Sequence, residues 1–540
     1  MQQRITINLN TDSKTTDKTT ILEYCRSHGI AGIETPCGGK GTCGKCKVTV
    51  TKPYCKDVLA CQTKICDGME IIVGGKESTI DKEDSMVVLT NGGSISEKFN
   101  EHVNRNVVLK EETANEHEKA ESNEGTLAAC DIGTTTVVCY LIDKETGQII
   151  AVRSGANPQR SFGADVLSRI NAAARADDND KANGGLQMMQ TQIVSLLNGW
   201  ISEMLTECGR TKVCRFSVAG NTVMCHLLMG ISPEKLGKAP FMPDEYFGRE
   251  FNPLDIGIEN CQTMIIFPAV SGFVGGDITA GMMETVNCNE LTLYLDIGTN
   301  GEMALGKGDR YVCCATAAGP AFEGAQIELG MPASKGAVDK VWLEGRRIKY
   351  SVIENDRPVG LCGSGLIDAL AVLLKAGIID ENGTILSGQE LPILFRSYVF
   401  EVEAEETAQS TESSLAVHIA PGVYITQEDI RKLQLAKGAI AAGIEVLFKE
   451  YGCTPCNIDV LTFAGGFGNY IDKASAAAIG LFPQELLDKA KEVGNAAGNG
   501  AVSAALSQEA WKRALDISGN MRYIELASYP HFNEMYVEHM

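Results

Sequence analysis

Three cysteines stand close together near the start of the chain, at Cys37, Cys43 and Cys46, in a segment rich in glycine. A Cys-x5-Cys-x2-Cys loop of this kind suits a [2Fe–2S] cluster, because glycine lets the backbone wrap closely and point its N–H groups at the sulfur atoms. A zinc site is the main alternative. Zinc sites prefer two short Cys pairs, however, and this segment holds one.

A fourth thiol is needed to complete such a cluster. Cys61 is the expected ligand, because it lies in the apolar sequence Leu-Ala-Cys-Gln, which would bury its sulfur. Cys55 and Cys66 are nearby and compete for this role. The sequence therefore identifies the first three ligands more firmly than the fourth.

The flanking segments indicate what positions these cysteines. Residues 4–9, 47–51 and 69–73 have the pattern of strands, and residues 20–28 have helical spacing. Strand pairs with one crossing helix form a β-grasp pattern. Residues 3–75 resemble a [2Fe–2S] ferredoxin of the plant and adrenal type, and the first gap of five residues is closer to the adrenal kind.

Composition sets limits on the partners and the compartment. The chain has 540 residues, 44% of them apolar, and a formal net charge of −21, which argues against nucleic acid or an anionic membrane as a partner. We find no apolar N-terminal signal and no long apolar run. The nineteen cysteines are therefore expected as thiols in the cytoplasm of a cell that is reducing and anaerobic.

Residues 76–125 are polar and charged, with brief apolar pieces. We predict a linker here, with a small ordered subdomain as the alternative. The domains expected are thus residues 1–75, the linker 76–125, and a larger region over residues 126–540.

The larger region opens with a strand, a tight turn and a second strand over residues 127–143. Glycine N–H groups and hydroxyls in such a turn can hold phosphate oxygens, and Asp131 at the strand end can hold the shell of a magnesium ion. The phosphate candidates in this turn are Gly133, Thr134, Thr135 and Thr136.

The same Asp-Ile-Gly-Thr turn recurs between two strands over residues 291–305. Two copies indicate an internal duplication, with a chance repeat as the alternative. The pair resembles the superfamily of acetate and sugar kinases, heat-shock ATPase chaperones and actin. That resemblance implies two ribonuclease-H-like halves that close on MgATP. The fold class expected is α+β and α/β multidomain, with a β-grasp ferredoxin domain, a linker and a duplicated actin-type ATPase fold.

A third glycine stretch follows a buried strand over residues 458–470. In the superfamily this element lies against adenosine, so the resemblance places Gly465, Gly466 and Phe467 at the nucleoside. The helix expected over residues 429–449 has an apolar stripe that favours a core position.

The order of these motifs resembles the ATP-dependent reductive activators of corrinoid proteins over nearly the whole chain. Such proteins return a cob(II)alamin-type cofactor to the cobalt(I) state used in methyl transfer. The resemblance implies a corrinoid protein of a methyltransferase system as partner, an upstream low-potential electron donor, and a homodimer as one possible assembly. Two alternatives stay open, namely an activator of a radical acyl-CoA dehydratase and a redox-sensing nucleotide switch.

The resemblance also implies roles for individual residues. Asp131 and Asp296 would organise Mg²⁺ and the attacking water, and Glu302 would orient that water or else face solvent. His226 is open between a contact with the corrinoid partner and a surface position on a helix. The remaining candidates for the nucleotide pocket are Gly298, Thr299, Asn300, Gly301, Gly319 and Glu323.

Overall fold

The computed structural model describes most of the chain. The described residues are 5–9, 19–27, 33, 46–52, 56–66, 69–73, 125–174, 184–298, 300–402, 414–465 and 471–540. Outside them lie residues 76–124 of the predicted linker and the site candidates Cys37, Cys43, Thr299, Gly466 and Phe467. The chain divides into two compact units, Met1–Glu284 with Ala497–Gly519, and Thr285–Ala496 with Asn520–Met540. No helix within the described ranges is long and apolar enough to cross a membrane.

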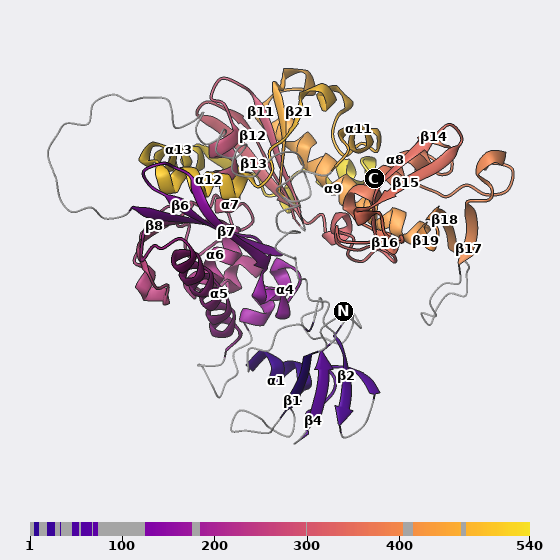
Figure 1. Ribbon diagram of the computed structural model, residues 1–540. Coiled ribbons are helices and arrows are strands. Elements are labelled where there is room, and N and C mark those ends of the chain that lie inside the picture. The colour runs from indigo at the N-terminus through magenta and orange to yellow at the C-terminus, as the bar shows by residue number, and fades with distance from the viewer. Residues whose placement is uncertain are drawn as a thin grey trace. The chain divides into compact units, whose positions relative to one another are not determined.

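The N-terminal part is a small sheet with one helix (Figure 1). Its elements are β1 (Ile5–Leu9), α1 (Ile21–Ser27), β2 (Lys47–Lys52), β3 (Lys56–Leu59) and β4 (Met69–Val73). The strands pair antiparallel in the order β1-β4-β2-β3. Ile21 and Leu22 of α1 share one buried core with Val50 and Ile71 of the sheet. The helix and three of the strands confirm the sequence prediction, whereas β3 was not predicted.

The first unit also contains a six-stranded sheet in the order β7-β6-β5-β8-β10-β9. Strands β5, β6 and β7 form an antiparallel meander, and β8 and β10 continue the sheet parallel to β5. The strands are β5 (Thr126–Ile132), β6 (Thr136–Asp143), β7 (Ile149–Ala156), β8 (Val213–Gly220), β9 (Arg249–Phe251) and β10 (Cys261–Ile266). The helices are α4 (Val166–Ala173), α5 (Gly185–Glu207), α6 (Thr222–Met229), α7 (Gly276–Thr285), α12 (Ala496–Leu506) and α13 (Gln508–Gly519).

The second unit is built on a sheet in the order β21-β20-β11-β12-β13-β22. Its strands are β11 (Thr292–Ile297), β12 (Gly301–Lys307), β13 (Arg310–Thr316), β20 (Val460–Ala464), β21 (Ala490–Glu492) and β22 (Met521–Tyr523). In the sequence between β13 and β20, the chain forms two further sheets of three strands each. The first consists of β14 (Ala337–Glu344), β15 (Arg347–Val352) and β16 (Gly360–Leu361). The second consists of β17 (Val399–Val402), β18 (Ser414–Ala420) and β19 (Val423–Thr426). The helices are α8 (Gly363–Lys375), α9 (Gln427–Tyr451), α11 (Lys473–Ala478) and α14 (Phe532–Glu538).

Five strands of each six-stranded sheet repeat one topology. In each, a three-stranded meander begins with the strand that carries the Asp-Ile-Gly-Thr turn, and two later strands add parallel to that first strand. This arrangement confirms the predicted duplication of a ribonuclease-H-like fold. The carboxyl ends of the parallel strands meet at one edge of each sheet, and that edge holds the glycine turns.

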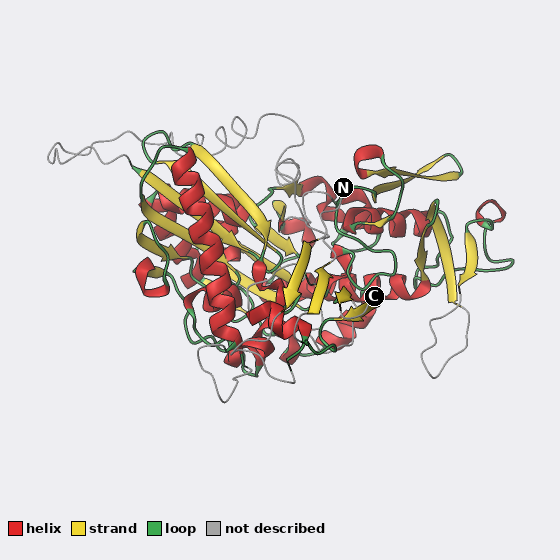
Figure 2. Cartoon of the chain, turned by 60° about the horizontal axis from the view of Figure 1, so that its bottom comes forward, coloured by secondary structure: helices red, strands yellow, loops and turns green. Residues whose placement is uncertain are grey.

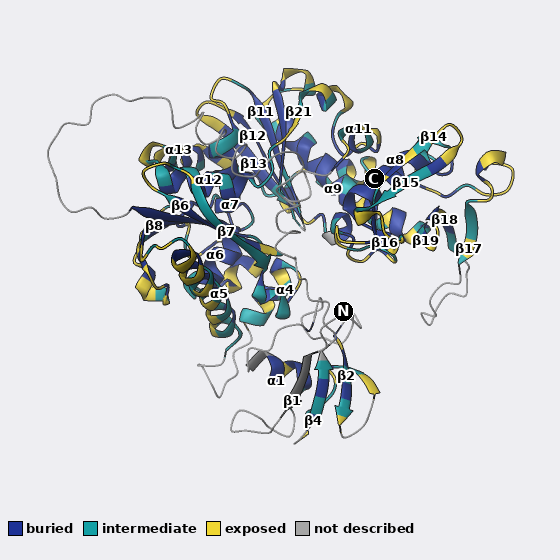
Figure 3. Cartoon of the chain, viewed as in Figure 1, coloured by how far each residue is buried: buried dark blue, intermediate teal, exposed yellow. Residues whose placement is uncertain are grey.

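Helices cover these sheets through regular apolar stripes. In α5, Met189, Ile193, Leu197 and Ile201 recur every four residues and are buried. Figure 2 shows this helix lying along one face of the first six-stranded sheet. The predicted core helix is α9, which begins at a capping box formed by Thr426 and Asp429. Figure 3 shows the central strands of both sheets as buried.

Candidate functional site

Two of the four predicted cluster ligands, Cys46 and Cys61, lie in the described part of the chain and are brought together. The N–H of Ala60 donates to the carbonyl oxygen of Cys46 at 2.8 Å, which joins the end of β3 to the start of β2. The two Sγ atoms are 3.2 Å apart. Two thiolates on one tetrahedral metal, with metal–sulfur bonds of about 2.3 Å, would lie about 3.8 Å apart. A small adjustment therefore fits the pair to one iron.

The other cysteines near this pair differ in their surroundings. Cys25 is buried in the core of the N-terminal domain, and burial raises the pKa of its thiol to about 12. Cys66 is exposed, and Cys55 lies outside the described residues. The contact between Cys46 and Cys61 supports Cys61 as the fourth ligand.

The first phosphate turn joins β5 to β6. The N–H of Gly133 donates to the carbonyl oxygen of Thr136 at 3.0 Å and closes the turn. The N–H groups of Thr134 and Thr135 have no acceptor among the described residues. Asp131 is the last residue but one of β5 and lies between Val138 of β6 and Ala219 of β8. The turn thus offers two N–H donors and threonine hydroxyls beside a carboxylate, as a polyphosphate with its metal requires.

The second turn joins β11 to β12 in the other unit. The N–H of Gly298 donates to the carbonyl oxygen of Asn300 at 3.0 Å. Across the hairpin, Asp296 is paired with Glu302, which is only 6% exposed. Glu302 is therefore a buried group beside Asp296, and the alternative that it faces solvent is wrong.

Gly465 lies directly against Asp296, because β20 runs parallel to β11 and ends beside it. Gly465 has a φ of +80°, and a Cβ atom there would lie 2.4 Å from Oδ1 of Asp296. Only glycine fits here, because it adopts a positive φ without strain and has no Cβ atom to overlap Asp296. The third glycine stretch and the second turn are thus parts of one site in this unit.

The segment after β13 also reaches this site. A Cβ atom at Gly298 would lie 3.7 Å from Oε1 of Glu323, so the Glu323 carboxylate approaches the second turn. Gly319 has a φ of +77° with no atom within 4 Å of a Cβ position. A short 3-10 helix, Pro320–Glu323, follows Gly319 directly and ends at Glu323.

One carboxylate near the first turn was not selected from the sequence. Asp277 stands in the first turn of α7, and a Cβ atom at Gly275 would lie 2.8 Å both from its Oδ1 and from Cα of Asn221. Burial raises the pKa of Asp277 to about 6. Burial raises the pKa of the Cys225 thiol, and the charges of Asp277 and Asp131 raise it further, so both carboxylates lie near that side chain. The sequence signal was the Gly-Gly-Asp turn after β10.

Neither expectation for His226 is correct. Its side chain is fully buried in α6, where Nδ1 is 2.8 Å from the carbonyl oxygen of Thr222. The ring packs edge-on against Phe247, with centroids 5.2 Å apart. Burial lowers the pKa of His226, so the ring is neutral. It is a core residue and offers no surface to a partner.

Comparisons with known proteins agree with this geometry. Residues 7–66 match the model of a 2Fe-2S iron-sulfur cluster binding domain, residues 127–287 the RACo middle region, and residues 290–540 the C-terminal ASKHA domain of RACo. The corrinoid activation enzyme RamQ of Eubacterium limosum is 32% identical over 96% of this chain and 95% of its own length.

The chain belongs to the RACo family of corrinoid activators.

Two further relatives extend this result. A solved reductive activator for a corrinoid, iron-sulfur protein has a TM-score of 0.65 and 29% identity over 97% of this chain and 95% of its own. A Methanosarcina barkeri reductase of a Co(II) methylated amine-specific corrinoid protein is 26% identical over 66% of this chain and 65% of its own length. As a RACo family member, the chain carries a [2Fe–2S] cluster domain and an ATPase domain that uses MgATP.

Proposed function

We propose that this chain is an ATP-dependent reductive activator that delivers one electron, through its [2Fe–2S] cluster, to the Co(II) form of a corrinoid protein and restores Co(I) for methyl transfer. The observation that carries the proposal is the match to a corrinoid activation enzyme over nearly the whole chain. The paired sulfurs of Cys46 and Cys61 and the two phosphate turns supply the parts that this activity needs.

An energetic reason links the two modules. Plant-type clusters have potentials near about −400 mV, and the Co(II)/Co(I) couple of a corrinoid is expected to be lower, so the transfer runs uphill. For one electron, each 59 mV is about a factor of ten, or about 1.4 kcal/mol. A gap of one or two hundred millivolts is thus a few kcal/mol, which a nucleotide-driven change of state can supply. ATP drives binding and release and transfers its phosphoryl group to no other substrate.

Within this proposal the two aspartates have matching roles. Asp131 and Asp296 hold Mg²⁺ through its water shell, and buried Glu302 orients the attacking water beside Asp296. The two turns bind the phosphates, through the residues Gly133, Thr134, Thr135, Thr136, Gly298, Thr299, Asn300 and Gly301. Nucleoside contacts come from Gly465, Gly466 and Phe467, and Gly319 and Glu323 are further residues of the nucleotide pocket. The cluster ligands are Cys37, Cys43, Cys46 and Cys61.

The proposal extends to domains and partners. Residues 1–75 carry the cluster, residues 76–125 link it to the ATPase region, and residues 126–540 form that region in two lobes. An upstream low-potential donor reloads the cluster after each transfer. A reducing compartment such as the cytoplasm suits a chain with nineteen cysteines. A homodimer stays a prediction, and the molar mass in solution tests it.

The test uses an anaerobic mixture of the reduced chain and a corrinoid protein in its Co(II) state, followed by visible spectroscopy. We expect the Co(I) band to grow with MgATP and to stay absent without it. Asp296→Asn should abolish this growth, whereas Asp309→Asn, in the exposed turn between β12 and β13, should preserve it. ATP hydrolysis without any change in cobalt state would overturn the proposal.

A further inference from the structure

Three carbonyl groups of the first phosphate turn accept hydrogen bonds from one layer, which consists of Asn157 and Arg169. Nδ2 of Asn157 donates to the carbonyl oxygen of Gly133 at 2.8 Å. The guanidinium of Arg169 donates to that of Thr134, and the backbone N–H of Asn157 to that of Thr135 at 2.8 Å. Three consecutive carbonyls are thereby fixed toward the same side.

These hydrogen bonds also determine which backbone groups lie on the opposite side of the turn. In a trans peptide the C=O and the next N–H point in opposite directions. Holding the carbonyls of Gly133 and Thr134 toward Asn157 and Arg169 therefore aims the N–H groups of Thr134 and Thr135 away from that layer. Those two N–H groups have no acceptor among the described residues.

Arg169 is an unusual residue for this layer, since its side chain is 0% exposed. Its Nε donates to the carbonyl oxygen of Gly163 at 3.0 Å, and its NH1 group lies 3.0 Å from Sδ of Met224. All of its hydrogen-bond acceptors within the described ranges are neutral. Asp165 forms no ion pair with it there and instead accepts two bonds from Ser168.

A buried cation without a carboxylate partner is costly unless an anion compensates it. Burial lowers the pKa of Arg169 to about 9, so the group stays charged at neutral pH. The positive charge of Arg160 lowers the pKa of the same guanidinium further, and the negative charge of Asp165 raises it by a smaller amount. Both positive charges favour an anion at this turn.

We propose that Arg169 is a positioning residue for the nucleotide: it fixes the Thr134 carbonyl so that the amide groups of the first turn face the polyphosphate, and its buried charge is balanced by that polyphosphate. This inference rests on the proposed binding of MgATP by this turn. It adds Arg169, which stands in no sequence motif, to the nucleotide site and explains why the residue is charged.

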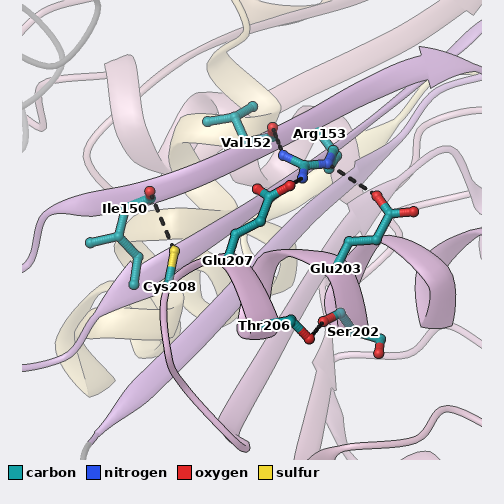
Figure 4. Close-up of polar contacts among 8 residues, drawn as sticks. All are labelled: Ile150, Val152, Arg153, Ser202, Glu203, Thr206, Glu207 and Cys208. Carbon is teal, nitrogen blue, oxygen red and sulfur yellow. Dashed lines mark hydrogen bonds and ion pairs between the residues drawn. The ribbon is translucent and has the colours of Figure 1, made fainter.

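The test compares Arg169→Met, which removes both charge and donors, with Arg169→Lys, which keeps the charge but loses the fork of donors. The matched control is Arg153→Met. Arg153 lies on β7 of the same unit and is 19% exposed, with Glu207 at 2.5 Å and Glu203 at 3.4 Å. Figure 4 shows it between these two carboxylates of α5, so its loss weakens packing without touching the turn.

We expect Arg169→Met to raise the KM for MgATP at least tenfold and to weaken MgADP binding by a similar factor. Arg169→Lys should give an intermediate KM. A purely structural role would lower the amount of active protein and leave KM unchanged, as we expect for Arg153→Met. An unchanged KM in Arg169→Met would overturn the inference.

Asn157→Asp provides a second variant if Arg169→Met does not fold. It keeps the bond from the N–H of Gln159 to the side-chain oxygen, but it replaces the Nδ2 donor with an oxygen that cannot donate to Gly133. Its KM should also rise, and an unchanged value would again overturn the inference. The assay is ATP hydrolysis by the full chain. A wild type that hydrolyses ATP but leaves cobalt unreduced would refute the proposed function alone, and one that does not bind MgATP would refute both.

Discussion

Cys61 is the residue at which the cluster assignment is most open to test. Its sulfur lies 3.2 Å from that of Cys46, whereas Cys66 is exposed. We expect Cys61→Ser to lose or shift the visible absorption of the cluster, because a hydroxyl replaces a thiolate ligand. Cys66→Ser is the matched control and should keep the wild-type spectrum. The reverse pattern would move the fourth ligand to Cys66.

Asp368 of α8 gives a prediction about pH. Its side chain is 5% exposed, and one oxygen accepts a bond from the N–H of Val341 at 3.2 Å. Burial raises its pKa to about 6, so its ionisation opposes folding. The native state binds this proton more tightly than the unfolded chain does. The stabilising contribution of protonated Asp368 is therefore lost as the pH rises from about 4 through 6.

The variant Asp368→Asn has no proton to lose and can still accept from Val341. Its stability relative to wild type should grow between pH 4 and pH 7 by on the order of 2 kcal/mol. Denaturant unfolding at several pH values measures this difference, and Asp309→Asn controls for the loss of one negative charge. A difference that does not change with pH would contradict the assignment.

At the residue scale, the sequence predicts the roles of residues in motifs but not those of buried residues outside motifs. Cys46, Asp131 and Asp296 were identified because they stand in spaced motifs. Arg169 and His226 could not be placed, because burial and partners decide what they do, and those depend on tertiary structure.

At the scale of elements, the end of β20 tests the second half-site. Gly465→Ala must place a methyl group against Asp296, because only 2.4 Å separates the Cβ position from Oδ1. We expect ATP hydrolysis to fall at least tenfold as Asp296 moves. Gly452→Ala is the matched control, since Gly452 has a φ of +79° and open space around it.

Both variants should lose about 1 kcal/mol of stability, which is the cost of a left-handed conformation for alanine. Gly465→Ala should lose more than Gly452→Ala, because its methyl group also overlaps Asp296. Only Gly465→Ala should lose activity at a temperature where both are folded. Equal activities, measured together with thermal unfolding, would show that Asp296 does not depend on this close approach.

Elements with a strong pattern were predictable, and those without one were not. The helix α9 and the hairpin strands have long apolar periods, so their positions agree with prediction. Strand β3 has two charged residues among its four and no buried one, so it left no apolar signal. Its pairing with β2 forms only in the folded domain.

For the whole molecule, motif order was more informative than any single motif. One cysteine loop and two phosphate turns predicted a ferredoxin domain joined to a duplicated ATPase, and the sheets and the RACo match confirm both. The order of the motifs could not predict how ATP binding affects electron transfer, because this coupling depends on states that exchange during the reaction.

The most direct test counts electrons. The cluster is reduced by one electron, the chain is mixed with excess Co(II) corrinoid protein under anaerobic conditions, and the paramagnetic signals of the reduced cluster and of Co(II) are followed together. With MgATP we predict that one Co(II) signal disappears for each cluster signal lost, and that without MgATP both persist. Oxidation of the cluster to the same extent without MgATP, or formation of Co(I) while the cluster stays reduced, would contradict the account.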